Sequence, residues 1–159
     1  PKLLLQDEPS SGLDPNARSD ILEAIIRTIS EDGRTVLFSS HLLDEVDRVC
    51  DSVALMHEGE IIDALTAEQL ELRYRELVCR PHSVWSGPPQ IGGFFGWRRS
   101  GEEWSVVRTA GEADMDALWK QCTVIDERAV SLGRWFEARV GSEASSTGSA
   151  ASDEVTTDV

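Results

Sequence analysis

Two adjacent carboxylates, Asp7 and Glu8, follow a run of three leucines near the start of the chain. An apolar run that ends in acids predicts a buried strand of a parallel sheet, since both faces of such a strand are covered. Ligands of open α/β sheets bind beyond the carboxyl ends of the strands, where these acids emerge. Neighbouring side chains on a strand point to opposite faces, so the two carboxylates cannot do the same work. One could hold Mg²⁺, directly or through water, while the other polarises an attacking water; the pair could also be simply the exposed end of a strand.

A histidine, His41, follows a second short β-rich run, Thr35–Phe38, and the serines Ser39 and Ser40. If both runs belong to one parallel sheet, the imidazole emerges at the same edge as Glu8. A neutral imidazole could donate to a phosphate oxygen from one nitrogen while the backbone orients the other. Most lone histidines are structural, so position alone leaves both interpretations open.

The element after the acid pair is predicted to be a helix. Asp14 followed by Pro15 is typical of a helix start, with Asp14 as the N-cap and proline at the first helical position. Gln6, inside the apolar strand, carries a buried amide that should be hydrogen-bonded or lie near polar groups, because an unsatisfied amide costs about 1–3 kcal/mol.

Further along, strands and helices continue to alternate. A helix is expected over residues 42–50, a hairpin turn over 58–60, and a third helix from the capping box of Thr66 and Gln69 to about Leu77. The alternation of strand and helix predicts an α/β fold with a mainly parallel sheet.

The segments Asp7-Glu8-Pro9 and Ser11-Gly12-Leu13-Asp14-Pro15 resemble the Walker B segment and D-loop of the ATP-binding cassette (ABC) ATPases. Residues 39–46 are similar to the switch, or H-loop, segment of the same family. The resemblance implies a partial P-loop NTPase sheet, with ATP and Mg²⁺ as cofactors. It covers residues 1 to about 78, and so only the C-terminal part of an ABC ATPase domain from Walker B onward.

The same resemblance implies roles for individual residues. Glu8 would be the general base or water-orienting carboxylate, His41 the contact to the γ-phosphate, and Asp7 the Mg²⁺ ligand. Ser11 and Gly12 would shape the D-loop, and Asp14 would reach a second ATPase subunit across the dimer interface. The cofactor-binding residues so implied are Asp7, Ser11, Gly12 and Asp14.

Composition excludes some functions. The 159 residues carry 15 Lys and Arg against 29 Asp and Glu, a net charge of −14, which argues against nucleic-acid binding and adhesion to anionic membranes. No run approaches the roughly 18 apolar residues of a membrane span, and no signal peptide is visible. Three widely spaced cysteines are typical of reduced thiols in a cytosolic protein.

Beyond residue 78 the pattern changes to prolines, glycines and clustered aromatics, which predicts a small α+β extension over 79–140. The aromatics with Arg98 and Arg99 could instead form a stacking platform for a nucleic acid or sugar, but the acidic chain favours a core. Residues 131–136, Ser-Leu-Gly-Arg-Trp-Phe, are similar to a Ser-Leu-x-x-x-Phe pattern in the C-terminal extensions of drug- and lipid-exporting ABC ATPases. Residues 141–159 are small, polar and acidic, which predicts a disordered tail.

The sequence contains neither the phosphate-binding Gly-x-x-x-x-Gly-Lys-Ser/Thr motif nor the ABC signature Leu-Ser-Gly-Gly-Gln. We therefore expect that this chain alone neither binds ATP tightly nor hydrolyses it. A strand that is apolar on both faces should be covered by neighbouring strands and helices. Poor solubility is therefore predicted unless a partner supplies them.

Three functions remain open from the sequence. The first is part of the ATP-hydrolysing subunit of an ABC transporter, held at the inner face of the cell membrane by a permease subunit and dimerising with a second ATPase subunit. The alternative is a non-catalytic truncated module that docks on a complete ATPase or permease. The third is a soluble ABC-type ATPase of DNA repair or translation, without the coiled coils or paired cassettes typical of that group. The transported substrate is not encoded in this chain.

Overall fold

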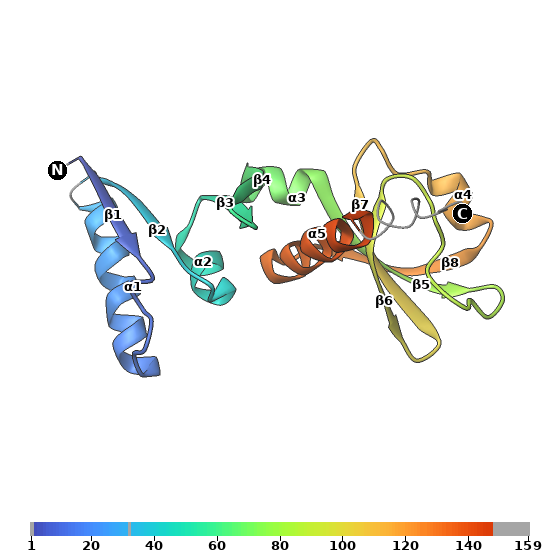
Figure 1. The fold of residues 1–159 in the computed structure, drawn as a ribbon, viewed down its shortest axis with the longest axis horizontal. Helices are drawn as coiled ribbons and strands as arrows, with labels where there is room; N and C mark the ends of the chain where they lie inside the picture. Colours follow the sequence, from blue (N-terminus) through green and yellow to red (C-terminus); the bar gives the residue numbers. More distant parts are fainter. Residues whose placement is uncertain (1, 32, 148–159) are drawn as a thin grey trace, which may run out of the picture. The chain divides into compact units, whose positions relative to one another are not determined.

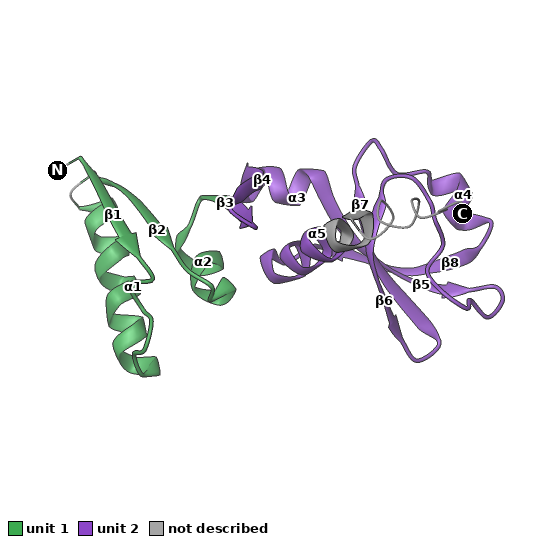
Figure 2. Ribbon diagram, in the orientation of Figure 1, with its two compact units in different colours: residues 1–53 green, residues 54–159 purple. Residues whose placement is uncertain are grey.

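The computed structural model describes residues 2–31 and 33–147, with side chains up to residue 141. By their internal contacts the residues form two compact units, 1–53 and 54–159 (Figure 2). The boundaries expected from sequence, at residues 78 and 140, differ from this division and stay predictions about which segments share a function.

The first unit is a β-α-β arrangement followed by a short helix (Figure 1). Strand β1 (Leu3–Asp7) pairs in parallel with β2 (Thr35–Ser39), and helix α1 (Pro15–Ser30) connects them. Helix α2 (Leu43–Val49) follows. The predicted parallel pairing is therefore confirmed, and its register places Asp7 opposite Ser39 at the carboxyl ends of both strands.

The two faces of the β1–β2 sheet differ in burial. Side chains on one face are partly buried, while Leu3, Leu5 and Leu37 on the other face are 49%, 65% and 63% exposed. Leu5 and Leu37 lie side by side in the register, so these three leucines form one apolar patch, called the leucine face below. A strand that is apolar on both faces is usually covered on both, so an exposed apolar face is expected where these residues do not supply the cover.

Gln6 lies on the more buried face. Its side-chain Oε1 is buried and has no hydrogen-bond partner among the residues that the structure describes. The expected hydrogen bond to this oxygen is thus not found, and a buried unsatisfied amide costs about 1–3 kcal/mol.

A hairpin and a capped helix lead out of the first unit. Strands β3 (Ser52–His57) and β4 (Glu60–Thr66) form a two-stranded sheet. The turn between them places Glu58 and Gly59 at φ of 49° and 84°, as two-residue hairpin turns with two left-handed residues require.

Helix α3 (Ala67–Arg73) opens with the predicted capping box, in which Thr66 and Gln69 exchange hydrogen bonds of 2.9 and 3.1 Å. The helix ends at Arg73 rather than at Leu77, because the residues that follow form strand β5. The predicted end of this helix was wrong.

The second unit is built on a four-stranded antiparallel sheet of order β6-β7-β5-β8. Its strands and helices are β5 (Tyr74–Pro81), β6 (Phe94–Ser100), β7 (Glu103–Thr109), α4 (Met115–Trp119), β8 (Cys122–Ala129) and α5 (Leu132–Thr147). The predicted fold class, α/β followed by a small α+β part, is confirmed for the described residues. Helix α5 continues to Thr147, so the prediction of a disordered tail was wrong for residues 141–147, and the rest of the predicted tail lies outside the described residues.

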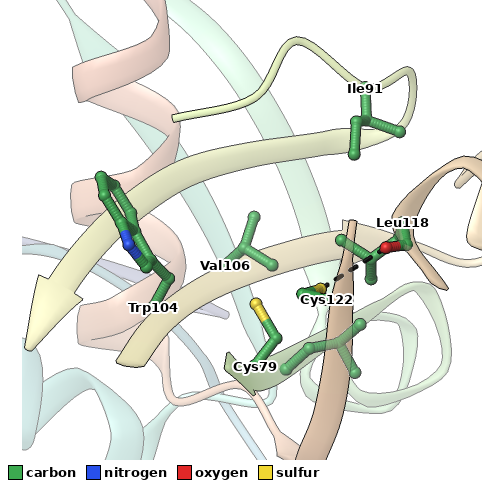
Figure 3. Close-up of a cluster of buried hydrophobic side chains, with 7 residues drawn as sticks. Cys79, Ile91, Trp104, Val106, Leu118 and Cys122 are labelled. Atoms are coloured by element: carbon green, nitrogen blue, oxygen red, sulfur yellow. Dashed lines mark hydrogen bonds between the residues drawn. The ribbon is translucent and has the colours of Figure 1, made fainter. Parts of the chain in front are cut away.

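One face of this sheet carries a buried hydrophobic cluster (Figure 3). The cluster comprises Leu77, Cys79, Ile91, Trp104, Val106, Leu118 and Cys122, with partly buried aromatic rings packed around it. Rings of Trp85, Trp97 and Trp104 lie with centroids 5.6 to 6.4 Å apart. The aromatic residues therefore form a core rather than an open stacking platform, as their acidic context favoured.

The three cysteines are free thiols. Burial, with Cys122 close by, raises the pKa of Cys79 to about 12, and the Cys122 thiol donates to the Leu118 carbonyl at 3.5 Å. Both cysteines are fully enclosed in the core, so they act there as small apolar side chains.

Candidate functional site

The carboxyl ends of β1 and β2 bring an acid and an imidazole into contact. Glu8 is the first residue after β1 and His41 the second after β2. The Glu8 Oε2 atom lies 2.8 Å from Nδ1 of His41, with side chains that are 34% and 67% exposed. Parallel pairing in register ends both strands at one level, and this explains why residues 33 positions apart meet.

Glu8 meets His41 through an unusual backbone conformation. Its φ is +45°, in the left-handed region that side chains other than glycine rarely adopt. The Glu8 N–H donates to Ser39 Oγ at 3.0 Å, and a backbone bond to Ser39 O measures 3.2 Å. The chain thus turns sharply directly after β1 and does not continue the alternation of a strand.

Asp7, the last residue of β1, is exposed and accepts a hydrogen bond from the hydroxyl of Ser39. Its carboxylate therefore lies at the same sheet edge as the Glu8–His41 contact. No group of three or more His, Cys, Asp or Glu side chains suited to a metal occurs in the described part of the chain. One carboxylate with an adjacent hydroxyl fits Mg²⁺, which takes one or two protein carboxylates and completes its shell with phosphate oxygens and waters.

The turn after Glu8 runs from Pro9 to Asp14. Ser11 and Gly12 are exposed, and Gly12 has a φ of 74°. Asp14 caps α1, since its Oδ1 accepts from the N–H groups of Asn16 and Ala17 at 2.9 and 3.1 Å. The structure therefore gives Asp14 the predicted capping role, while its role at a dimer interface stays a prediction.

Three residues of this region were not singled out from the sequence: Ser39, Ser10 and Glu45. The hydroxyl of Ser10, which is fully buried, donates to Glu45 Oε2 at 2.5 Å, and this bond joins the turn after Glu8 to helix α2 after His41. Ser39 joins the ends of the two strands. The equal length of two parallel strands was the signal that could have identified Ser39 as the neighbour of Asp7.

The contact also differs from the expectation for His41 in one respect. The partner of Nδ1 is the Glu8 carboxylate, not the backbone. A carboxylate is an acceptor, so Nδ1 carries the proton in this contact, and the Nε2 of a neutral ring is then an acceptor. Donation from Nε2 to a phosphate oxygen therefore requires the imidazolium form or release of Glu8.

Asp7, Glu8 and His41 thus lie at the carboxyl ends of two parallel strands, the place where open α/β sheets bind their ligands. No family model matches the chain. Over part of its length, its sequence is nevertheless similar to many ATP-binding proteins of ABC transporters.

Particular relatives cover a limited stretch. The chain is 37% identical over 76 residues to the bacitracin transport ATP-binding protein BcrA of Enterococcus faecalis, which covers 48% of this chain and 25% of BcrA. It is 42% identical over 62 residues to the linearmycin resistance ATP-binding protein LnrL of Bacillus subtilis (39% and 20% of the two chains). It is 44% identical over 62 residues to the ABC transporter ATP-binding protein NatA of the same species (39% and 25%). The chain thus spans a quarter or less of the curated relatives it matches.

Among solved structures, the chain is similar to CbiO1 of Clostridium perfringens, described as part of the ABC transporter complex CbiONQ. The identity is 36% and the TM-score 0.40, over 43% of this chain and 28% of CbiO1. Within the described residues, no helix is both long and apolar enough to cross a membrane.

Proposed function

We propose that this chain supplies the Walker B, D-loop and H-loop part of the ATP-binding subunit of an ABC transporter of the drug- or lipid-exporting type. The 2.8 Å contact between Glu8 and His41, at the edge where Asp7 also lies, carries the proposal. The exporter type is supported by the names of two relatives, which refer to bacitracin transport and linearmycin resistance.

In this function Glu8 orients or deprotonates the water that attacks the γ-phosphate. A general base must lie within hydrogen-bond reach of that water, and the exposed position of Glu8 at the sheet edge allows such access. As an imidazolium, His41 would donate to Glu8 from Nδ1 and to a γ-phosphate oxygen from Nε2. Asp7 would hold Mg²⁺, and the ion would supply positive charge that stabilises the negative charge of the phosphates.

The phosphate-binding loop and the signature segment must come from residues other than these 159. We therefore propose that the chain alone neither binds ATP tightly nor hydrolyses it, and that its partners are the rest of the ATP-binding domain, a second ATPase subunit and a membrane permease. The proposed location is the inner face of the cell membrane.

The test is Glu8→Gln in the complete ATP-binding protein. Gln keeps the shape but cannot accept a proton, so ATP turnover should fall by about 10²- to 10⁴-fold while nucleotide binding is retained. Glu23→Gln, an exposed change on α1, is the matched control and should leave turnover unchanged. Turnover that survives Glu8→Gln contradicts the role of Glu8 and favours the alternative, a non-catalytic module that docks on a complete ATPase or permease.

A further inference from the structure

A single side chain, Ser39, contacts both acids of the candidate site. Its hydroxyl donates to Asp7 Oδ1 and accepts from the backbone N–H of Glu8 at 3.0 Å. A hydroxyl offers one donor and two acceptor positions, so one group serves both residues at once. The contacts cross from the end of β2 to the end of β1, over 31 and 32 positions of sequence.

The contact to Glu8 acts on a strained backbone. A residue other than glycine in the left-handed region costs about 1–3 kcal/mol and persists only where its surroundings hold it. At Glu8, whose φ is +45°, the N–H is shared between the hydroxyl and the carbonyl of Ser39. Loss of the hydroxyl leaves the Glu8 N–H with the longer bond, of 3.2 Å, to the Ser39 carbonyl.

The strained turn decides where the Glu8 carboxylate lies. If β1 continued as a regular strand, the side chains of Asp7 and Glu8 would point to opposite faces of the sheet. In the observed turn its Oε2 reaches His41, which stands only two residues after Ser39. Ser39 is therefore close to His41 in sequence and in contact with both acids in space.

We propose that Ser39 is a positioning residue for hydrolysis: it aligns Asp7 and fixes the backbone of Glu8 so that both carboxylates face the same phosphoryl group. This inference rests on the proposed function. It assigns no contact of Ser39 with nucleotide; its effect passes through the two acids. A hydroxyl is required, because alanine offers neither the donor nor the acceptor.

The first test measures ATP turnover in the complete ATP-binding protein. Ser39→Ala should lower kcat on the order of 10- to 100-fold with little change in KM, since a displacement of about 1 Å at a reacting group costs this much. Ser39→Thr keeps the hydroxyl and should restore most of kcat. Ser30→Ala, at the exposed end of α1, is the matched control and should change neither constant.

The second test uses amide hydrogen exchange of the 159-residue chain itself. The Glu8 amide should exchange several-fold faster in Ser39→Ala than in wild type, while the Asn16 amide, bound to Asp14 Oδ1, keeps its rate. Equal acceleration of both amides would indicate general loosening and overturn the inference.

The outcomes separate the two proposals. If Glu8→Gln abolishes turnover but Ser39→Ala keeps its kcat, or Ser39→Thr fails to restore it, Ser39 is not a positioning residue and the proposed function stands. If Glu8→Gln keeps its turnover, the proposed function fails and no reaction remains for Ser39 to support, whatever the exchange rates.

Discussion

Asp14 has a role in the structure that requires no nucleotide. Its carboxylate accepts from two amides in the first turn of α1, where the backbone N–H groups have no partner within the helix. The D-loop role implied by family resemblance needs a second subunit. The two roles are therefore separable by experiment, because only the cap acts within an isolated chain.

Asp14→Ala should weaken the start of α1 by about 1 kcal/mol, the usual cost of removing an N-cap. The Asn16 and Ala17 amides should then exchange roughly fivefold faster, as hydrogen exchange of the isolated chain can measure. Asp20→Ala, at an exposed position inside the same helix, is the control and should leave these rates unchanged or slower. Unchanged exchange in Asp14→Ala would mean that the capping bonds contribute nothing.

The sequence permits prediction of Asp7, Glu8 and His41 as neighbours because they follow strands of a parallel pair, and the structure brings them together. It does not predict the left-handed backbone of Glu8, since nothing local favours that conformation for glutamate. The sequence does not predict the buried hydrogen bond between Ser10 and Glu45 either. Serine and glutamate are usually surface residues, and only the fold shows that these two are enclosed together.

At the scale of elements, the end of α3 was predicted wrongly because strand pairing overrides the local helix preference there. The capping box sets the start of the helix, but β5 takes over at Tyr74 because it pairs with β7 on one side and β8 on the other. The paired residues lie 25 to 54 positions further along, so a local pattern cannot reveal them. By contrast, the partners in the hairpin of β6 and β7 are close in sequence.

Helix α5 is fastened to β5 by a buried ion pair. Arg134 Nε donates to Glu76 Oε1 at 2.7 Å, and both side chains are less than a tenth exposed. Arg128 on β8 donates to the other oxygen of the same carboxylate at 2.9 Å. One carboxylate therefore joins a central strand, an edge strand and a helix.

Glu76→Ala should lower the free energy of unfolding by about 3–5 kcal/mol, because it leaves the Arg134 guanidinium buried without its partner. Urea unfolding followed by circular dichroism measures this. The control is Glu103→Ala, which breaks an exposed pair with Arg80 and should cost less than about 1 kcal/mol. Similar losses in the two variants would argue that the buried pair adds no special stability.

The same pair predicts a pH dependence. Burial raises the pKa of Glu76. The hydrogen bonds and charges of Arg134 and Arg128 lower the pKa by more than burial raises it, so the net pKa lies below the usual glutamate value. Just below that usual value the unfolded chain binds more protons than the folded one, and stability is lost as pH falls toward the folded pKa. The loss of unfolding free energy on acidification should therefore be steeper in wild type than in Glu76→Gln.

On the scale of the whole molecule, the two units differ in how fully their sheets are covered. The sheet of the second unit buries the cluster of Figure 3 on one face and packs Tyr74 against Trp135 on the other. The sheet of the first unit leaves the leucine face in water. Exposed apolar patches of this kind favour association.

Leu37→Lys should reduce self-association of the isolated chain, since a charge on the leucine face opposes its burial. Burying one leucine is worth about 1.5–3 kcal/mol, so the association constant should fall roughly 10- to 100-fold in analytical ultracentrifugation. Leu72→Lys is the matched control: Leu72 is 70% exposed on α3, in the second unit, and its change should have little effect. An equal response to both changes would show that general charge, not the leucine face, governs association.

The strands that carry the leucine face are the same strands whose ends carry Asp7, Glu8 and His41. A partner that covered those leucines and shifted β1 against β2 would therefore move the Glu8 carboxylate relative to the His41 imidazole. Under the proposed function, docking on the leucine face and hydrolysis at the strand ends would thus be coupled through two five-residue strands. The ATP turnover of the complete ATP-binding protein should consequently depend on how well these two strands are held in register.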